Sequence, residues 1–201
     1  MTVFELVGKG GWIMVSIALC SIVGAWVYIE RVLAYRLLKT DAGRLVDLIK
    51  PMIMADNADQ AREKLSSLDD AASRVLRAGL SVYDKGRQAT REAIEGEANY
   101  QVYQIEERTS VLATVAGVAP LLGFLGTVLG MIKAFQQIEG LGGNVNATVL
   151  AGGIWEAMVT TAAGLAVGIP AIIAYNHLQS MMRSIIASME KAGDELLNLM
   201  A

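Results

Sequence analysis

One carboxylate inside an apolar run is the strongest chemical signal in the chain. Glu156 lies near the start of WEAMVTTAAGLAVGIPAIIAYN, residues 155–176. A charge at mid-bilayer costs at least about 2.5 kcal/mol on insertion scales, so intramembrane acids tend to mark ion pathways, proton relays or buried pairings. Two interpretations of Glu156 stay open here: a proton-binding site, or a structural acid that pairs with a neighbouring helix or lies near the outer interface.

Hydroxyls and small residues accompany this acid at helical spacing. One face of the helix is polar or small and carries Glu156, Thr160, Thr161, Gly164 and Gly168. Larger apolar residues occupy the remaining positions, which suits them to lipid or protein packing. The spacing therefore predicts that the polar face lines an interior or a pore.

A second strip of small residues precedes it in the sequence. Gly123, Gly126, Thr127 and Gly130 fall within about 100° of one another on a 3.6-residue helix, and Pro120 lies one turn before them. Small residues at this spacing are the usual packing faces of membrane helices. The Thr127 hydroxyl has two open uses, since it can donate to water or to a carbonyl of its own helix.

The sequence carries no familiar catalytic or metal-binding motif. His177 is the only histidine and Cys20 the only cysteine, and they are far apart in the sequence. An interfacial histidine and a packed cysteine are the more frequent uses of such residues. We therefore predict no enzymatic activity, no metal and no cofactor, and an intramembrane protease is disfavoured.

Composition indicates an integral membrane protein. Of 201 residues, 54% are hydrophobic, and the mean hydropathy is +0.43. Three apolar runs stand out, Gly10 to Ile29, Thr109 to Ile132, and Ala147 to Asn176, the last interrupted only by Glu156. Each is long enough to span about 30 Å of hydrocarbon as a helix. Because no alternating strand pattern occurs between them, the predicted fold class is all-α.

The placement of charge predicts the topology. Thirteen of the 17 Lys and Arg fall between Arg31 and Arg108. Four of these cations lie close behind the first span, where the positive-inside rule counts most: Arg31, Arg36, Lys39 and Arg44. The middle section is therefore expected in the cytoplasm, with the N-terminus outside. Fourteen acids balance these cations, so no nucleic-acid partner is expected.

The chain is predicted to be a single unit of residues 1–201. Its expected parts are spans at about 11–29, 109–135 and 148–176, a cytoplasmic helical region at 30–108, an outer loop at 137–147 and a cytoplasmic tail helix at 177–201. In the middle region we expect helices from Asp41 to Lys50, stopped by Pro51, from Ala58 to Leu65, and from Asp70 to Lys85, ended by Gly86. One long helix is expected from near Arg87 to Gln137, extending the bundle below the membrane.

Two blocks resemble a known family. APLLGFLGTVLGM, from Ala119 to Met131, and EAMVTTAAGLAVGIPA, from Glu156 to Ala171, together with the closing Tyr175 and Asn176, are similar to the ExbB/TolQ/MotA proton-channel proteins of the bacterial inner membrane. The three-span layout is closest to ExbB or TolQ, because MotA proteins have a fourth span. Trp155 departs from the small or polar residue that the family often has before Glu156.

The resemblance implies an assembly. ExbB-like subunits form a homopentamer in the lipid bilayer, whose second and third spans line a central pore. The pore holds a dimeric, single-span ExbD- or TolR-like partner that contributes a titrating Asp. By resemblance, Thr127 and Thr161 face that Asp and Glu156 lies in the same ring. Pro120, Gly123, Gly126 and Pro170 match positions that shape the helices.

The sequence therefore predicts a subunit that couples the proton motive force to a TonB- or TolA-like protein, with protons as the coupling ion. Whether it acts as ExbB or as TolQ is open. The alternative is a non-conducting membrane scaffold, in which the glycine strips only pack helices and Glu156 is a pairing residue.

Overall fold

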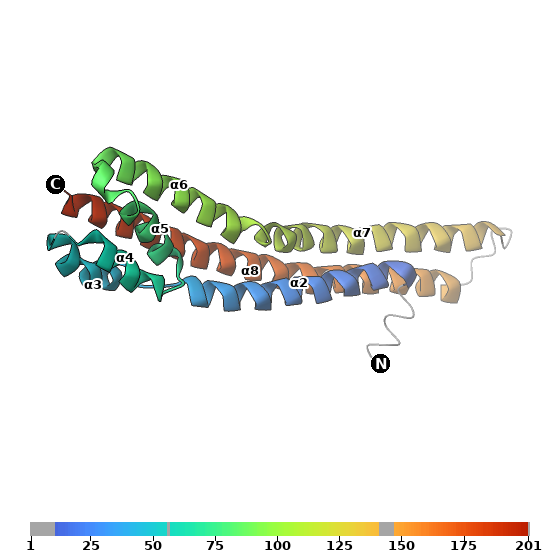
Figure 1. The fold of residues 1–201 in the computed structure, drawn as a ribbon. Coiled ribbons are helices and arrows are strands. Elements are labelled where there is room, and N and C mark those ends of the chain that lie inside the picture. Colours follow the sequence, from blue (N-terminus) through green and yellow to red (C-terminus); the bar gives the residue numbers. More distant parts are fainter. Residues whose placement is uncertain (1–10, 56, 141–146, 201) are drawn as a thin grey trace. The chain divides into compact units, whose positions relative to one another are not determined.

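The computed structural model describes residues 11–55, 57–140 and 147–200, and these residues form helices and short connections without a strand. The elements in chain order are α2 (Gly11–Leu38), α3 (Ala42–Met54), α4 (Ala58–Ser66), α5 (Ala71–Leu80), the 3-10 helix η1 (Tyr83–Lys85), α6 (Arg87–Glu106), α7 (Thr109–Gly140) and α8 (Ala147–Leu199) (Figure 1). The predicted all-α fold is confirmed for this part of the chain.

The chain divides into two compact units. Unit 1 comprises residues 1–29 and 109–176, and unit 2 comprises residues 30–108 and 177–201. Unit 1 thus holds the three apolar runs, and unit 2 holds the charged middle section with the C-terminal part of α8. The helices α2 and α8 each contribute to both units.

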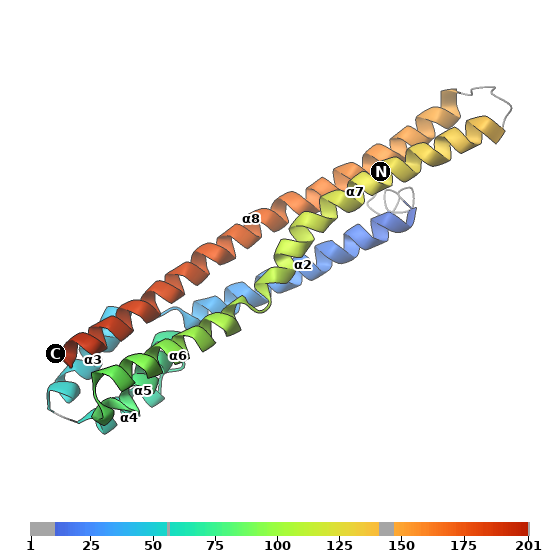
Figure 2. The same cartoon turned by 90° about the horizontal axis from the view of Figure 1, so that it is seen from above.

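Three helices form unit 1, and they run side by side in both views (Figures 1 and 2). Ile13, Met14 and Ile17 of α2 are buried together. Partly buried side chains of α7 and α8 pack against them: Leu122, Leu129, Val159, Ala163 and Val167. This cluster fixes which side of α7 and α8 faces α2.

Unit 2 is a small helical bundle in which α5 packs on α4 and α6. Ile94 of α6 lies against two glycines, because a Cβ added at Gly79 or at Gly193 would come within 2.8 Å or 2.7 Å of its side chain. The C-terminal part of α8 supplies buried Ile185, Met189, Ala192 and Leu196. The predicted tail helix is part of α8, which continues without a break from the third apolar run to Leu199.

Side-chain caps begin the short helices of unit 2. Asp41, Asn57 and Asp70 each accept a hydrogen bond from a backbone N–H of the first turn of α3, α4 and α5, respectively. Gly86 ends η1 with a φ of +91°, a conformation that favours glycine. The helix predicted from Asp70 to Lys85 is wrong at its end, because α5 ends at Leu80 and only the separate η1 runs up to Gly86.

Pro51 does not stop its helix, contrary to the sequence prediction. It lies inside α3, which continues to Met54. Proline cannot donate to the carbonyl of Asp47, but the loss falls close to the helix end. Pro51 is exposed, and the buried stripe of Leu45, Ile49 and Ile53 continues past it on the other side of the helix. Packing therefore favours the continued helix.

The long helix predicted from Arg87 to Gln137 is also wrong in part, because a turn at residues 107–108 separates α6 from α7. Two side chains of α2 hold this turn. The Tyr35 hydroxyl donates to the carbonyl of Ile105 at 2.8 Å, and Arg108 Nη1 lies 3.2 Å from Glu30 Oε1. These side chains satisfy polar groups where the helix is interrupted.

At its other end α7 continues to Gly140, so residues 137–140 are helical where the outer loop was expected. The rest of that loop, residues 141–146, lies outside the described residues, as does the N-terminal segment 1–10.

Three helical stretches are long and apolar enough to cross a membrane among the described residues. They lie within Gly11–Met54, Arg87–Gly140 and Leu150–Leu199. Their positions agree with the three apolar runs of the sequence.

Candidate ion pathway between the apolar helices

The central contact of unit 1 is a ladder of small residues between the antiparallel helices α7 and α8. A Cβ added at Gly164 would lie 2.5 Å from the Ala119 carbonyl oxygen and 2.9 Å from the Gly123 Cα. Because those atoms are backbone, the two helices could not approach as closely with larger residues. The predicted packing strips are therefore the two sides of one contact.

The ladder extends in both directions from this pair. Gly126 lies against Thr160, and a Cβ added at Gly130 would come 3.0 Å from the Ala157 Cβ. At the other end, Gly168 lies against the ring of Pro120, so the predicted helix-shaping proline is part of the same contact. Pro170 lies within α8 on its exposed side.

Thr160 is placed inside this ladder and not on an open surface. Its side chain is buried, with 1% of the residue exposed, and its hydroxyl donates to the Ala157 carbonyl at 2.7 Å. A hydroxyl bonded to its own helix makes the side chain compact and locally satisfied. The geometry gives Thr160 a packing contact within the chain.

Thr161 and Thr127 lie at the margin of the ladder, each partly exposed. The Thr161 hydroxyl donates across the helix contact to the Gly123 carbonyl at 2.9 Å. The Thr127 hydroxyl donates to the Phe124 carbonyl of its own helix at 2.6 Å. Both hydroxyls retain acceptor lone pairs, so each can accept a further hydrogen bond.

These two threonines share one side of the helix pair. Successive residues are about 100° apart on a helix, so Thr161 is about 160° from Val159 and Ala163, which face α2. Thr127 is likewise about 160° from Leu129 on α7. Thr127 and Thr161 therefore lie on the side of α7 and α8 that points away from α2.

Glu156 lies on the opposite side, toward α2. It precedes Val159, Ala163 and Val167 by three, seven and eleven residues, which places it in the stripe that packs on α2. A Cβ added at Gly11, in the first turn of α2, would lie 3.7 Å from Glu156 Oε1. The structure thus separates Glu156 from the two threonines around the helix axis.

Lys133 of α7 is the charged partner of Glu156, with 3.7 Å between Lys133 Nζ and Glu156 Oε1. Sequence reasoning missed this lysine because it follows the second apolar run directly. The register of the antiparallel pair contained the signal, since Gly130 opposite Ala157 places residue 133 within about one turn of residue 156 along the helix axis. The contact favours the pairing interpretation of Glu156.

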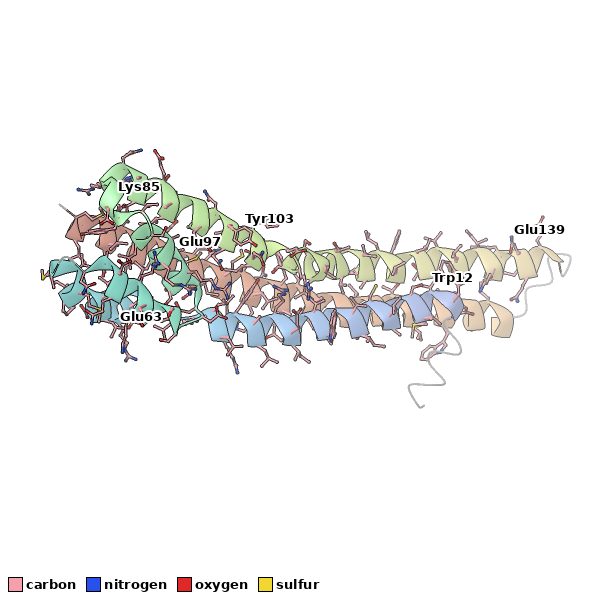
Figure 3. All side chains as sticks on the ribbon, in the orientation of Figure 1. Trp12, Glu63, Lys85, Glu97, Tyr103 and Glu139 are labelled. Carbon is pink, nitrogen blue, oxygen red and sulfur yellow. The ribbon has the colours of Figure 1, made fainter. Side chains whose placement is uncertain are left out.

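Large apolar side chains cover much of the outer surface of unit 1. Exposed examples are Trp12, Leu121, Phe124, Trp155, Met158, Ile169 and Ile173, of which Trp12 is labelled in Figure 3. A soluble monomer rarely exposes so much contiguous apolar surface. In a membrane, lipid tails or neighbouring helices cover it.

Among the described residues, no three His, Cys, Asp or Glu side chains come together as a metal site requires. The described part of unit 1 places two threonine hydroxyls on one side of the helix pair and an ion pair on the other.

Three long apolar helices that pack along a glycine ladder indicate an all-helical membrane protein. The family model of the MotA/TolQ/ExbB proton channel family matches residues 67–191. The chain belongs to this family, as the resemblance of its two sequence blocks predicted.

Similar curated proteins carry the names ExbB and TolQ. The chain is 31% identical over 199 residues to an ExbB-like biopolymer transport protein of Synechocystis sp., covering 94% of this chain and 75% of that protein. It is 38% identical over 96 residues to the Tol-Pal system protein TolQ of Haemophilus influenzae, covering 48% of this chain and 42% of TolQ. It is 35% identical over 108 residues to the biopolymer transport protein ExbB of Xanthomonas campestris, covering 54% and 41% of the two chains.

Proposed function

We propose that this chain is a proton-channel subunit of an inner-membrane motor. It couples the proton motive force through an ExbD- or TolR-like partner to a TonB- or TolA-like protein, in transport or envelope maintenance. The observation that carries the proposal is the common side of Thr127 and Thr161, which α2 leaves uncovered. Membership of a proton channel family supports it.

In this proposal five copies surround a central pore, with the threonine side of each α7–α8 pair turned inward and α2 turned toward lipid. Apolar residues beside the threonines, such as Phe124 and Met158, are exposed in the single chain and become covered in the assembly. The pore holds a dimeric, single-span partner with one transmembrane Asp.

The proposed topology follows the positive-inside rule, with residues 30–108 and 177–201 in the cytoplasm and the N-terminus and outer loop in the periplasm. The whole chain, 1–201, acts as one functional unit, protons are the coupling ion, and no cofactor is needed.

The threonine hydroxyls act as a switch in pairing. A neutral Asp of the partner can donate its proton to a lone pair of Thr161, whose own hydrogen stays on the Gly123 carbonyl. An ionised Asp instead attracts the hydroxyl hydrogen, which leaves that carbonyl and donates to the carboxylate. The membrane field supplies about 2.3 kcal/mol per elementary charge per 100 mV to drive the cycle.

Thr160 takes no part in this switch, because it is buried against Gly126. In the proposal it belongs to the helix contact, together with Gly123, Gly130 and Gly164.

Thr161→Val tests the switch. The variant keeps the shape of the side chain and removes the hydroxyl, so we expect the complex to assemble and proton flux to fall by at least about tenfold, as for the loss of a roughly 1.4 kcal/mol interaction. Flux is measured in vesicles that contain the chain and its partner, with a pH-sensitive dye and an imposed proton gradient.

Thr114→Val is the matched control, because the Thr114 hydroxyl donates to Ser110 of its own helix and lies away from the ladder. Flux should stay at the level of the unaltered protein. Normal proton flux in Thr161→Val would show that the Thr161 hydroxyl is not needed for proton transfer.

The non-conducting scaffold remains the second candidate, since the glycine ladder and the Lys133–Glu156 pair suffice for helix packing. It predicts that the unaltered complex conducts no protons at all, which the same vesicle measurement tests.

A further inference from the structure

Three charged side chains occur among the described residues of unit 1: Lys133, Glu139 and Glu156. The described part of α2 within this unit carries none. Glu139 lies six residues beyond Lys133 on α7 and is exposed, whereas Glu156 and Lys133 approach to 3.7 Å between the two helices. This ion pair has no place in the threonine switch, so its presence in an apolar unit calls for a separate role.

The surroundings of Glu156 argue against a proton carrier in the pore. Its side chain is 33% exposed, Lys133 lies on one side of the carboxylate, and the first turn of α2 lies on another. A carrier in the pore needs to meet the partner's Asp, but Glu156 faces α2 with Val159 and Ala163. It is therefore placed where a fixed charge could join three helices.

We propose that Lys133 is a positioning residue that holds Glu156 in an ion pair at the outer end of α7 and α8. The pair keeps Glu156 out of the proton-carrying step and fixes the helix register from which Thr127 and Thr161 present their hydroxyls. This inference rests on the proposed function of the threonine side.

The physical reason is the cost of a lone charge beside apolar helices. Without the ammonium, the carboxylate has two options: to remain charged near α2 or to turn outward to water. Either outcome alters the outer helix contact. With Lys133 in place, an ammonium 3.7 Å away offsets the charge of the carboxylate and keeps it at this contact.

Removing one charge of the Lys133–Glu156 pair should therefore lower proton flux more than removing both charges. Lys133→Met leaves the carboxylate alone, and we expect proton flux to fall at least threefold. The double variant Lys133→Met, Glu156→Gln leaves no charge and should recover flux to within twofold of the unaltered protein. The exchanged pair Lys133→Glu, Glu156→Lys should also recover it.

Rescue by the second substitution separates a positioning role from general damage. If Lys133→Met lowered flux only by disturbing the fold, the added Glu156→Gln change would not restore it. Glu139→Gln is the matched control, since it neutralises an exposed acid of the same helix and should leave flux unchanged.

The measurement uses the full complex in vesicles, and native mass spectrometry reports assembly of each variant. If Lys133→Met fails to assemble but the double variant assembles and conducts, the pairing role is supported. Loss of flux in Glu156→Gln that the double variant does not repair would overturn the proposal and make Glu156 a carrier.

The proposed threonine switch is tested independently of the role of Lys133. Loss of flux in Thr161→Val alone supports the switch whatever the Lys133 variants do. Unaltered flux in Lys133→Met would overturn the positioning role and would leave the threonine switch untested by that variant.

Discussion

Gly164 shows most directly how single residues build the candidate site. An added Cβ would meet backbone atoms of Ala119 and Gly123, which cannot rotate away as a side chain can. Close contact of this kind is what holds membrane helices together where the hydrophobic effect is absent. The register of the threonines thus depends on this glycine.

Gly164→Ala should destabilise the protein by about 1–3 kcal/mol, as expected for overpacking in a tight contact. The change is measured as a lower melting temperature of the purified protein in detergent, followed by tryptophan fluorescence. Gly152→Ala in the same helix is the control, because an added methyl there meets nothing within 4 Å. Equal melting temperatures for both variants would show that α7 and α8 leave room for a methyl group at residue 164.

Residue types were easier to predict from the sequence than their directions. Helical spacing placed Glu156, Thr160 and Thr161 on one broad polar face, but the structure sends them to three different surroundings: α2, the ladder and the open side. The neighbouring helix decides among positions about 100° apart, and a single-helix pattern contains no neighbour. For the same reason the sequence pattern of α7 does not indicate that Lys133 contacts Glu156, because that contact depends on how α7 packs against α8.

At the scale of elements, the turn between α6 and α7 is held by side chains distant in the sequence. Tyr35 is fully buried, and its hydroxyl donates to the Ile105 carbonyl. Arg108 pairs with Glu30, which also contacts Arg31 at 3.2 Å. Specific side-chain contacts within unit 2 therefore stabilise the turn at residues 107–108.

Tyr35→Phe should weaken this turn by about 1 kcal/mol, the usual net contribution of a buried hydrogen bond. We expect faster amide hydrogen exchange at residues 105–110 in the intact protein, with other helices little changed. Tyr103→Phe is the control, since Tyr103 is exposed on α6 (Figure 3). Identical amide hydrogen exchange at residues 105–110 in the two variants would show that the Tyr35 hydroxyl does not stabilise this turn.

Helix type and approximate position followed from apolar periodicity and from caps such as Asp70 and Gly86. Some helix ends could not be predicted from these patterns. Pro51 was expected to stop α3, but the buried stripe on both sides of it outweighs one missing hydrogen bond. The turn at residues 107–108 depends on Tyr35 and Glu30, and local sequence carries no trace of such partners.

At the scale of the whole molecule, the three apolar helices and the two sequence blocks identify a membrane protein of the MotA/TolQ/ExbB family. The single chain leaves the threonine side open and exposes large apolar residues there, among them Phe124 and Met158. An uncovered side of this kind suits assembly around another helix. The proposed motor therefore requires further copies and a partner.

Native mass spectrometry of the complex, purified in mild detergent after expression with its neighbouring genes, tests this central claim most directly. The account predicts five copies of this chain with two copies of a single-span protein that carries one transmembrane Asp. A monomer, or an oligomer that binds no such protein, would contradict the motor and leave a scaffold or an independent channel.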